Sequence, residues 1–185
     1  MPTSLSLFLK SVPSIAGEIL HVDGDQSARP LAHHRRDSHM STTRLFLGFL
    51  AGALSHLIFQ GGFGAILYVA HLIPALLWSL APVPPLGVPR SLSLAFWAGL
   101  WGLVYALLEP RLTAHFGWWV GGLVFGIAPL LVYWFVVLPL KGAGVGGGFH
   151  LKMVPIEVAF HVVFGIGVAI IFRCGLALAR RSVMP

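Results

Sequence analysis

The stretch LFLGFLAGALSHLIFQGGFGAILYVAH (residues 45–71) contains no Asp, Glu, Lys or Arg, and it decides the class of this chain. Charged residues stay absent as far as residue 89, and they are absent again from residues 91–108, 112–140 and 158–172. Because about 20 apolar residues cross a bilayer as a helix, these regions predict transmembrane helices. The sequence therefore predicts an all-α polytopic membrane helix bundle of about four transmembrane helices.

Composition agrees with a chain that is dissolved mainly in lipid. Hydrophobic residues make up 57% of it and charged residues 10%, and the mean hydropathy is +0.86. The net charge of +6 comes from basic residues at the ends of apolar runs, a pattern that does not predict a nucleic-acid partner. The only cysteine, Cys174, excludes an intramolecular disulfide and a thiolate metal cluster within one chain. The expected partner is the lipid bilayer.

The N-terminal residues differ from the rest of the chain. Residues 1–40 are polar, and their one short apolar stretch is followed by Lys10, which does not suit a signal peptide. We expect a disordered tail there and a single transmembrane domain in residues 41–185. Met40 stands just before the first span and is an alternative start of translation to Met1.

The predicted spans cover about residues 44–71, 92–108, 117–138 and 154–172. A straight helix over the first apolar region, residues 45–81, would be about 54 Å long, against a hydrocarbon core of about 30 Å. We therefore expect a break near Gly61-Gly62 or an end near Pro74. The proline-rich residues 81–89 predict an ordered loop or a surface cap, and Glu109-Pro110-Arg111 is expected to end the second span.

Basic residues predict the orientation of the chain in the membrane. With four spans, the larger group falls on the side expected to be cytoplasmic: Lys10, Arg29, Arg35, Arg36, Arg44, Arg111, Arg173, Arg180 and Arg181. The smaller group falls outside: Arg90, Lys141 and Lys152. Both termini are then cytoplasmic.

Small residues recur four positions apart in every predicted span. The pairs are Gly48 and Gly52, Ala95 and Gly99, Ala98 and Gly102, Gly117 and Gly121, Gly122 and Gly126, and Gly165 and Ala169. Such pairs let two helix backbones approach closely in lipid. They predict packing within one bundle or, alternatively, a face for a homo-oligomer or a larger membrane complex.

Polar residues within the spans are the candidate functional residues. His56 and Gln60 share one face of the first span with small residues, and we expect them to bond to another span or to line a polar cavity. His71 lies near the outer end of that span. Packing is the simpler interpretation of these residues, and a proton or ligand pathway is the alternative.

Glu157 and His161 lie one helical turn apart in the fourth span. A carboxylate beside an imidazole can hold or relay a proton, whereas an ion pair with Lys152 at the membrane edge is the structural alternative. Adding His150 gives a set of two histidines and one carboxylate, but its spacing matches no established metal motif. The sequence contains no motif for catalysis, and we predict no catalytic, cofactor-binding or metal-binding residue.

Several motifs resemble an uncharacterised group of small polytopic bacterial inner-membrane proteins. They are APVPPLGVP (residues 81–89), LSLAFWAGLWG (92–102), IFQG (58–61) and FVVLPLK (135–141). The likeness covers about residues 45–172, although several proteins of the group have His-Gln where this chain has Phe59-Gln60. The resemblance implies a multi-pass protein of the bacterial inner membrane, and it implies no activity.

Three functions remain open at this point. The leading hypothesis is a non-enzymatic structural or accessory subunit, because the short loops offer almost no soluble domain and the small-residue faces suit helix packing. A second is a small transporter or proton-coupled channel component, with His56, Gln60, Glu157 and His161 along its route. A third is a haem-binding redox membrane protein with His56, His71 or His161 as axial ligands.

Overall fold

The computed structural model describes residues 29–182 as secondary structure, with side chains from residue 42 onward. Most of the predicted disordered tail lies outside the described residues, whereas residues 29–40 already belong to the first helix, α1 (Arg29–Leu54). The chain divides into two units, Met1–His39 and Met40–Pro185. The features below belong to the second unit.

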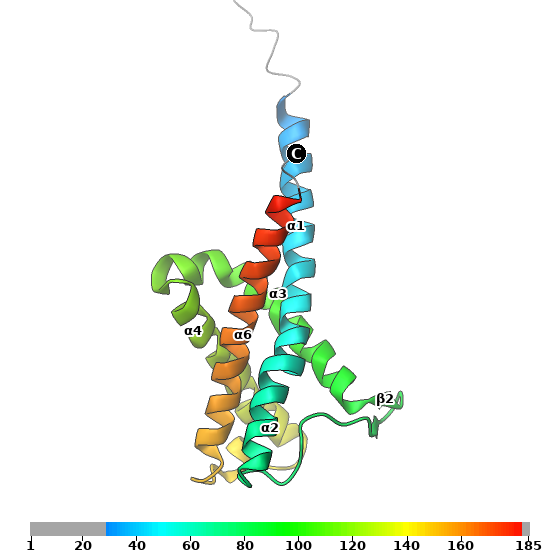
Figure 1. Cartoon of the computed structure of the whole chain (residues 1–185), viewed down its shortest axis with the longest axis vertical. Coiled ribbons are helices and arrows are strands. Elements are labelled where there is room, and N and C mark those ends of the chain that lie inside the picture. The colour runs from blue at the N-terminus through cyan, green and yellow to red at the C-terminus, as the bar shows by residue number, and fades with distance from the viewer. Residues whose placement is uncertain (1–28, 183–185) are drawn as a thin grey trace, which may run out of the picture. The chain divides into compact units, whose positions relative to one another are not determined.

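Four helical spans in this unit are long and apolar enough to cross a membrane: Thr42–Val69, Arg90–Phe116, Trp118–Leu140 and Val154–Arg181 (Figure 1). Their number and position confirm the predicted all-α bundle. The chain is therefore a multi-pass membrane protein. The second and fourth spans are longer than the sequence predicted, because the helix continues through the polar residues at their C-terminal ends.

The first span continues through the two glycines that were candidates for a break. α1 passes into a π-helical segment, η1 (Ser55–Gln60), and then into α2 (Gly61–Val69). The dihedral angles of Gly61 are those of an α-helix. The helix ends at Val69, shortly before Pro74, which was the other candidate. His71 follows with a φ of 57° and turns the chain.

The second span, α3 (Arg90–Phe116), runs through Glu109-Pro110-Arg111, where the sequence predicted its end. Pro110 has no N–H to give to the carbonyl of Ala106, four residues earlier. The guanidinium of Arg44 donates to that carbonyl instead, at 3.1 Å from Nη2 to the oxygen. A side chain from the first span thus replaces the lost bond, and the helix continues.

The third and fourth spans form a closely packed pair. The third consists of α4 (Trp118–Val132), the π-helical η2 (Tyr133–Val137) and α5 (Leu138–Leu140), and α6 (Val154–Arg181) packs along α4. A Cβ on Gly122 would lie 2.7 Å from the Cβ of Ala169 and 2.8 Å from the carbonyl oxygen of Gly165. Only glycine permits this approach of the two backbones.

The first and second spans cross in the same way. A Cβ on Gly48 would lie 2.6 Å from the Cβ of Ala106 and 2.6 Å from the carbonyl oxygen of Gly102. A Cβ on Gly52 would lie against the backbone of Ala98. Four of the small-residue pairs found in the sequence therefore serve packing within the chain.

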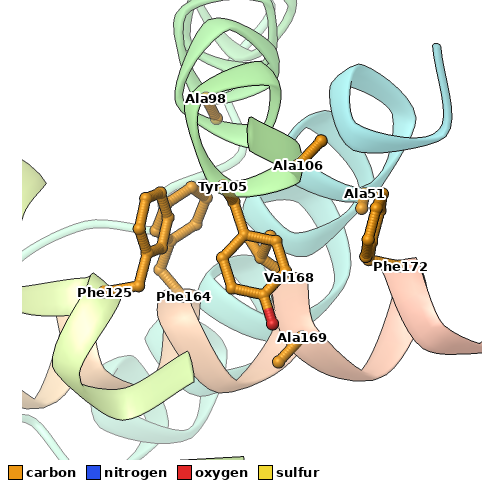
Figure 2. Close-up of a cluster of buried hydrophobic side chains, with 9 residues drawn as sticks. All are labelled: Ala51, Ala98, Tyr105, Ala106, Phe125, Phe164, Val168, Ala169 and Phe172. Atoms are coloured by element: carbon orange, nitrogen blue, oxygen red, sulfur yellow. The ribbon is translucent and has the colours of Figure 1, made fainter. Parts of the chain in front are cut away.

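An aromatic core joins the two crossings. Tyr105 of α3 lies between Phe125 of α4 and Phe172 of α6, with ring centroids 5.0 Å and 5.6 Å away (Figure 2). Tyr105 and Phe172 are completely buried. The core is completed by Ala51, Ala98, Ala106, Phe164, Val168 and Ala169.

Two connections lie at the end of the spans where α2 finishes. In the proline-rich stretch, β1 (Pro82–Val83) pairs antiparallel with β2 (Val88–Pro89), so an ordered loop is present as predicted. The glycine-rich connection contains a short 3-10 turn, η3 (Val145–Gly148), in which positive φ angles require glycine. Phe149, which follows η3, packs edge-on against Trp134 at 5.4 Å between ring centroids.

Candidate functional site

His56 and Gln60 are brought together by the π-helical segment η1. His56 Nδ1 and Gln60 Oε1 are 2.8 Å apart, and Gln60 Nε2 donates to the carbonyl oxygen of Phe160 in α6 at 3.1 Å. His56 is buried. The expected bond from this face to another span is therefore present, and it joins the first span to the fourth.

Ser55 makes a second bond between the same two spans. This completely buried side chain donates from Oγ to the carbonyl oxygen of Phe164 at 2.8 Å. Gly167 provides the space, because a Cβ there would meet Ser55 and Phe59. The sequence analysis did not single out Ser55, although it adjoins His56. Ser55 and Gln60 are five residues apart, and a π-helical turn places residues at this spacing on the same face of the helix.

Glu157 and His161 lie on the part of α6 that faces the third span. Trp134 Nε1 donates to Glu157 Oε2 at 2.6 Å, and His161 Nδ1 lies 2.8 Å from the backbone carbonyl of Glu157. The imidazole thus bonds to the backbone of Glu157, whereas its carboxylate bonds to an indole. Within residues 42–182, Lys152 forms no ion pair with Glu157, so the suggested ion pair at the membrane edge is not present there.

The partners of Glu157 and His161 come from η2, the second π-helical segment. Tyr133 packs on the His161 ring at 5.6 Å between centroids, and Trp134 holds the carboxylate. Both π-helical segments of the spans therefore carry polar side chains that face α6, and π-bulges occur frequently at functional sites.

The remaining candidate histidines stand apart. His71 is exposed beyond the end of α2, about 20 Å along the helix axis from His56, so these two cannot ligate one haem in a single chain. His150 is exposed in the loop before α6. In the described part of the chain no three His, Cys, Asp or Glu side chains lie close enough to hold a metal ion, so His150, Glu157 and His161 do not form a metal set.

An ion pair that sequence reasoning missed lies at the other end of the spans. Arg44 Nη2 lies 2.9 Å from Glu109 Oε2, and Thr113 donates to Glu109 Oε1 at 3.0 Å. The Arg44 guanidinium also lies over the Phe172 ring, 5.2 Å from its centroid. A signal was available in the sequence, because consecutive antiparallel spans bring the start of the first beside the end of the second.

The chemistry of these groups is that of interhelical contacts. Each bond from Ser55, Gln60, Arg44 or Trp134 joins two different spans. In the described residues, every buried side-chain nitrogen or oxygen atom has a hydrogen-bond partner.

No protein-family model, no curated protein and no solved structure matches this chain.

Proposed function

We propose that this chain is a non-enzymatic structural subunit of a membrane assembly, formed by self-association or with other membrane proteins. The observation that carries the proposal is the use of the polar side chains in the spans. Ser55, Gln60, Arg44 and Trp134 each bond to a neighbouring span. Polar groups at these positions are costly in lipid unless paired, so they favour a fixed arrangement of the helices.

Backbone contacts support the same proposal. Gly48 and Gly122 lie at two crossings where a side chain larger than hydrogen would enter the neighbouring helix. Such close contacts between backbones favour one arrangement of the helices. A bundle whose spans are held together at these contacts is suited to scaffolding.

Copurification tests this proposal. The chain is expressed at its native level with a C-terminal tag, extracted in mild detergent, and every companion is identified and counted. A stoichiometric companion, either another protein or a second copy, is the expected result. A monomeric chain without any companion would contradict the proposal.

A second candidate function is a proton-coupled transport component, and the two π-helical segments favour it. They place His56, Gln60 and Tyr133 against the α6 turns that carry Glu157 and His161. The Nδ1 atoms of both imidazoles bond within their own helix, and in residues 42–182 neither Nε2 atom has a hydrogen-bond partner. Flux in liposomes is the measurement. Flux that the unmodified protein shows and that both His56→Leu and Glu157→Gln lose would support this function. Equal flux from the unmodified protein and the two variants would contradict it.

The location that we propose is the bacterial inner membrane, with both termini in the cytoplasm. An even number of spans places both ends of the chain on one side, and the basic residues Arg44, Arg111 and Arg173 lie at that end of the spans. The resemblance of residues 81–102 to small bacterial inner-membrane proteins supports the same location. A C-terminal alkaline phosphatase fusion is expected to be inactive, and an active fusion would reverse the orientation.

A further inference from the structure

A guanidinium and an indole lie together at the end of the spans where Arg44 lies. The Cζ atom of Arg173 in α6 is 5.3 Å from the centroid of the Trp118 ring, at the start of α4. The α4–α6 crossing fixes this contact, because the two helices pack side by side through Gly122 and Ala169 (Figure 1). Trp118 lies one turn before Gly122, and Arg173 lies one turn after Ala169. The register of the two spans therefore places the cation over the ring.

Arg173 has no counter-charge in this part of the chain. Residues 42–182 contain two carboxylate side chains, Glu109 and Glu157, and Glu157 lies at the opposite end of α6. Glu109 is already paired with Arg44. Arg173 is exposed, and it forms neither an ion pair nor a hydrogen bond with a side chain that the structure describes. Its charge and its donors are therefore not used by the described residues.

The Arg173–Trp118 pair lies at the level of the lipid headgroups. Arg173 directly follows the charge-free residues 158–172 of α6. The side chains of Trp118 and Trp119 are 38% and 56% exposed. Tryptophan and arginine side chains at the end of a span are typical of the interface between membrane and water. The phosphate groups of the lipids lie in this interfacial layer.

We propose that the Arg173–Trp118 pair binds the phosphate group of an anionic phospholipid. A guanidinium is planar, and the donors along its edge match two phosphate oxygens while its face lies on an aromatic ring. The Trp118 ring thus holds the cation in place and leaves these donors to the lipid. An anionic lipid is favoured over a zwitterionic one, because a zwitterionic headgroup brings a cation of its own.

This site needs a single chain. Both side chains belong to the same α4–α6 crossing, and no residue of another copy or of another protein takes part. The inference therefore does not depend on the proposed function as a structural subunit.

Native mass spectrometry of the purified full chain tests the site. The detergent solution contains either dioleoylphosphatidylglycerol, which is anionic, or dioleoylphosphatidylcholine, which is zwitterionic, at the same concentration. We expect the unmodified protein to retain phosphatidylglycerol more strongly than phosphatidylcholine. We expect Arg173→Gln to lower the fraction of protein that carries one phosphatidylglycerol several-fold.

Arg180→Gln is the matched control for charge. It removes the same charge from another exposed position of α6, about 10 Å farther along the helix axis. We expect it to change the bound fraction little. If Arg173→Gln does not accumulate, Arg173→Lys replaces it, and we expect a loss there too because an ammonium cannot make two parallel bonds to a phosphate.

Two substitutions of Trp118 test the ring while every charge is kept. Trp118→Phe retains an aromatic face beneath the guanidinium, so we expect the lipid to stay bound. Trp118→Leu removes that face, so we expect the bound fraction to fall.

Three results would overturn the site. The first is an equal loss from Arg173→Gln and Arg180→Gln, which would mean that diffuse charge attracts the lipid. The second is equal retention of the two lipids by the unmodified protein. The third is full retention by Trp118→Leu. A monomeric chain that still retains phosphatidylglycerol through Arg173 would contradict the proposed function and leave this inference standing.

Discussion

The α1–α3 crossing and the α4–α6 crossing share glycine contacts between their backbones, but different polar side chains join the two helices of each pair. Each brings two backbones together at glycines, Gly48 against Gly102 and Gly122 against Gly165. At the first crossing, a salt bridge between Arg44 and Glu109 also joins the two helices. At the second, the two helices are joined by a hydrogen bond from the Trp134 indole to the carboxylate of Glu157.

The difference concerns charge. At the first crossing the carboxylate meets a guanidinium, and its two oxygens accept from Arg44 and Thr113. At the second crossing Trp134 is a neutral donor, and Glu157 has no cation within 4.0 Å in residues 42–182. The first crossing therefore pairs its carboxylate with a cation of the same chain, whereas the second pairs its carboxylate with a neutral donor.

Replacing a glycine at a crossing with a large side chain has the largest expected effect. It tests the close backbone contact that is common to both crossings. Gly102→Leu and Gly165→Leu would each push a side chain into the backbone of the opposite helix, so we expect folded protein to be lost. The yield of monodisperse protein in detergent measures this. Gly62→Leu is the control, since a Cβ there would have nothing within 4 Å. Equal yields from all three variants would contradict close backbone contact.

Neutralising the carboxylates separates the two crossings. Glu109→Gln leaves the Arg44 guanidinium without its counter-charge, and we expect it to lower the free energy of unfolding by about 2 kcal/mol. Glu157→Gln keeps an oxygen that can accept from the Trp134 indole, so its cost should stay below about 1 kcal/mol. Unfolding in mixed micelles provides the measurement. A larger loss of unfolding free energy for Glu157→Gln than for Glu109→Gln would contradict this expectation.

Ser55 connects the two crossings, because it joins the first span to α6. Ser55→Ala removes the bond to the Phe164 carbonyl and is expected to cost about 1 kcal/mol. Ser182→Ala is the control, since Ser182 bonds to a carbonyl of its own helix and is exposed. The same unfolding assay applies, and equal costs would mean that Ser55 does not hold the spans together.

Thr113→Val has the smallest expected effect. It removes one donor to Glu109 Oε1 and leaves the bond from Arg44 intact, so we expect a cost of about 0.5 kcal/mol. A cost as large as that of Glu109→Gln would show that Thr113, and not Arg44, fixes the carboxylate.

The sequence predicted the four spans because charge-free runs of this length are typical of helices that cross a membrane. It also predicted that small residues would pack and that the face of His56 and Gln60 would bond to another span. It placed the end of the second span wrongly, because the role of Pro110 depends on Arg44, which is distant in the sequence. The partners of Glu157 and His161 were not predictable either, since the π-helical turn at Tyr133 that positions Trp134 has no sequence signature.

The central claim is that this chain is a subunit and not an isolated bundle. The most direct test is to extract the tagged protein together with its surrounding lipid in a polymer and to measure the mass of the protein in the particle. We expect a complex larger than one chain of 19.9 kDa, with a constant protein stoichiometry between preparations. A particle that contains a single chain in every preparation would contradict the account.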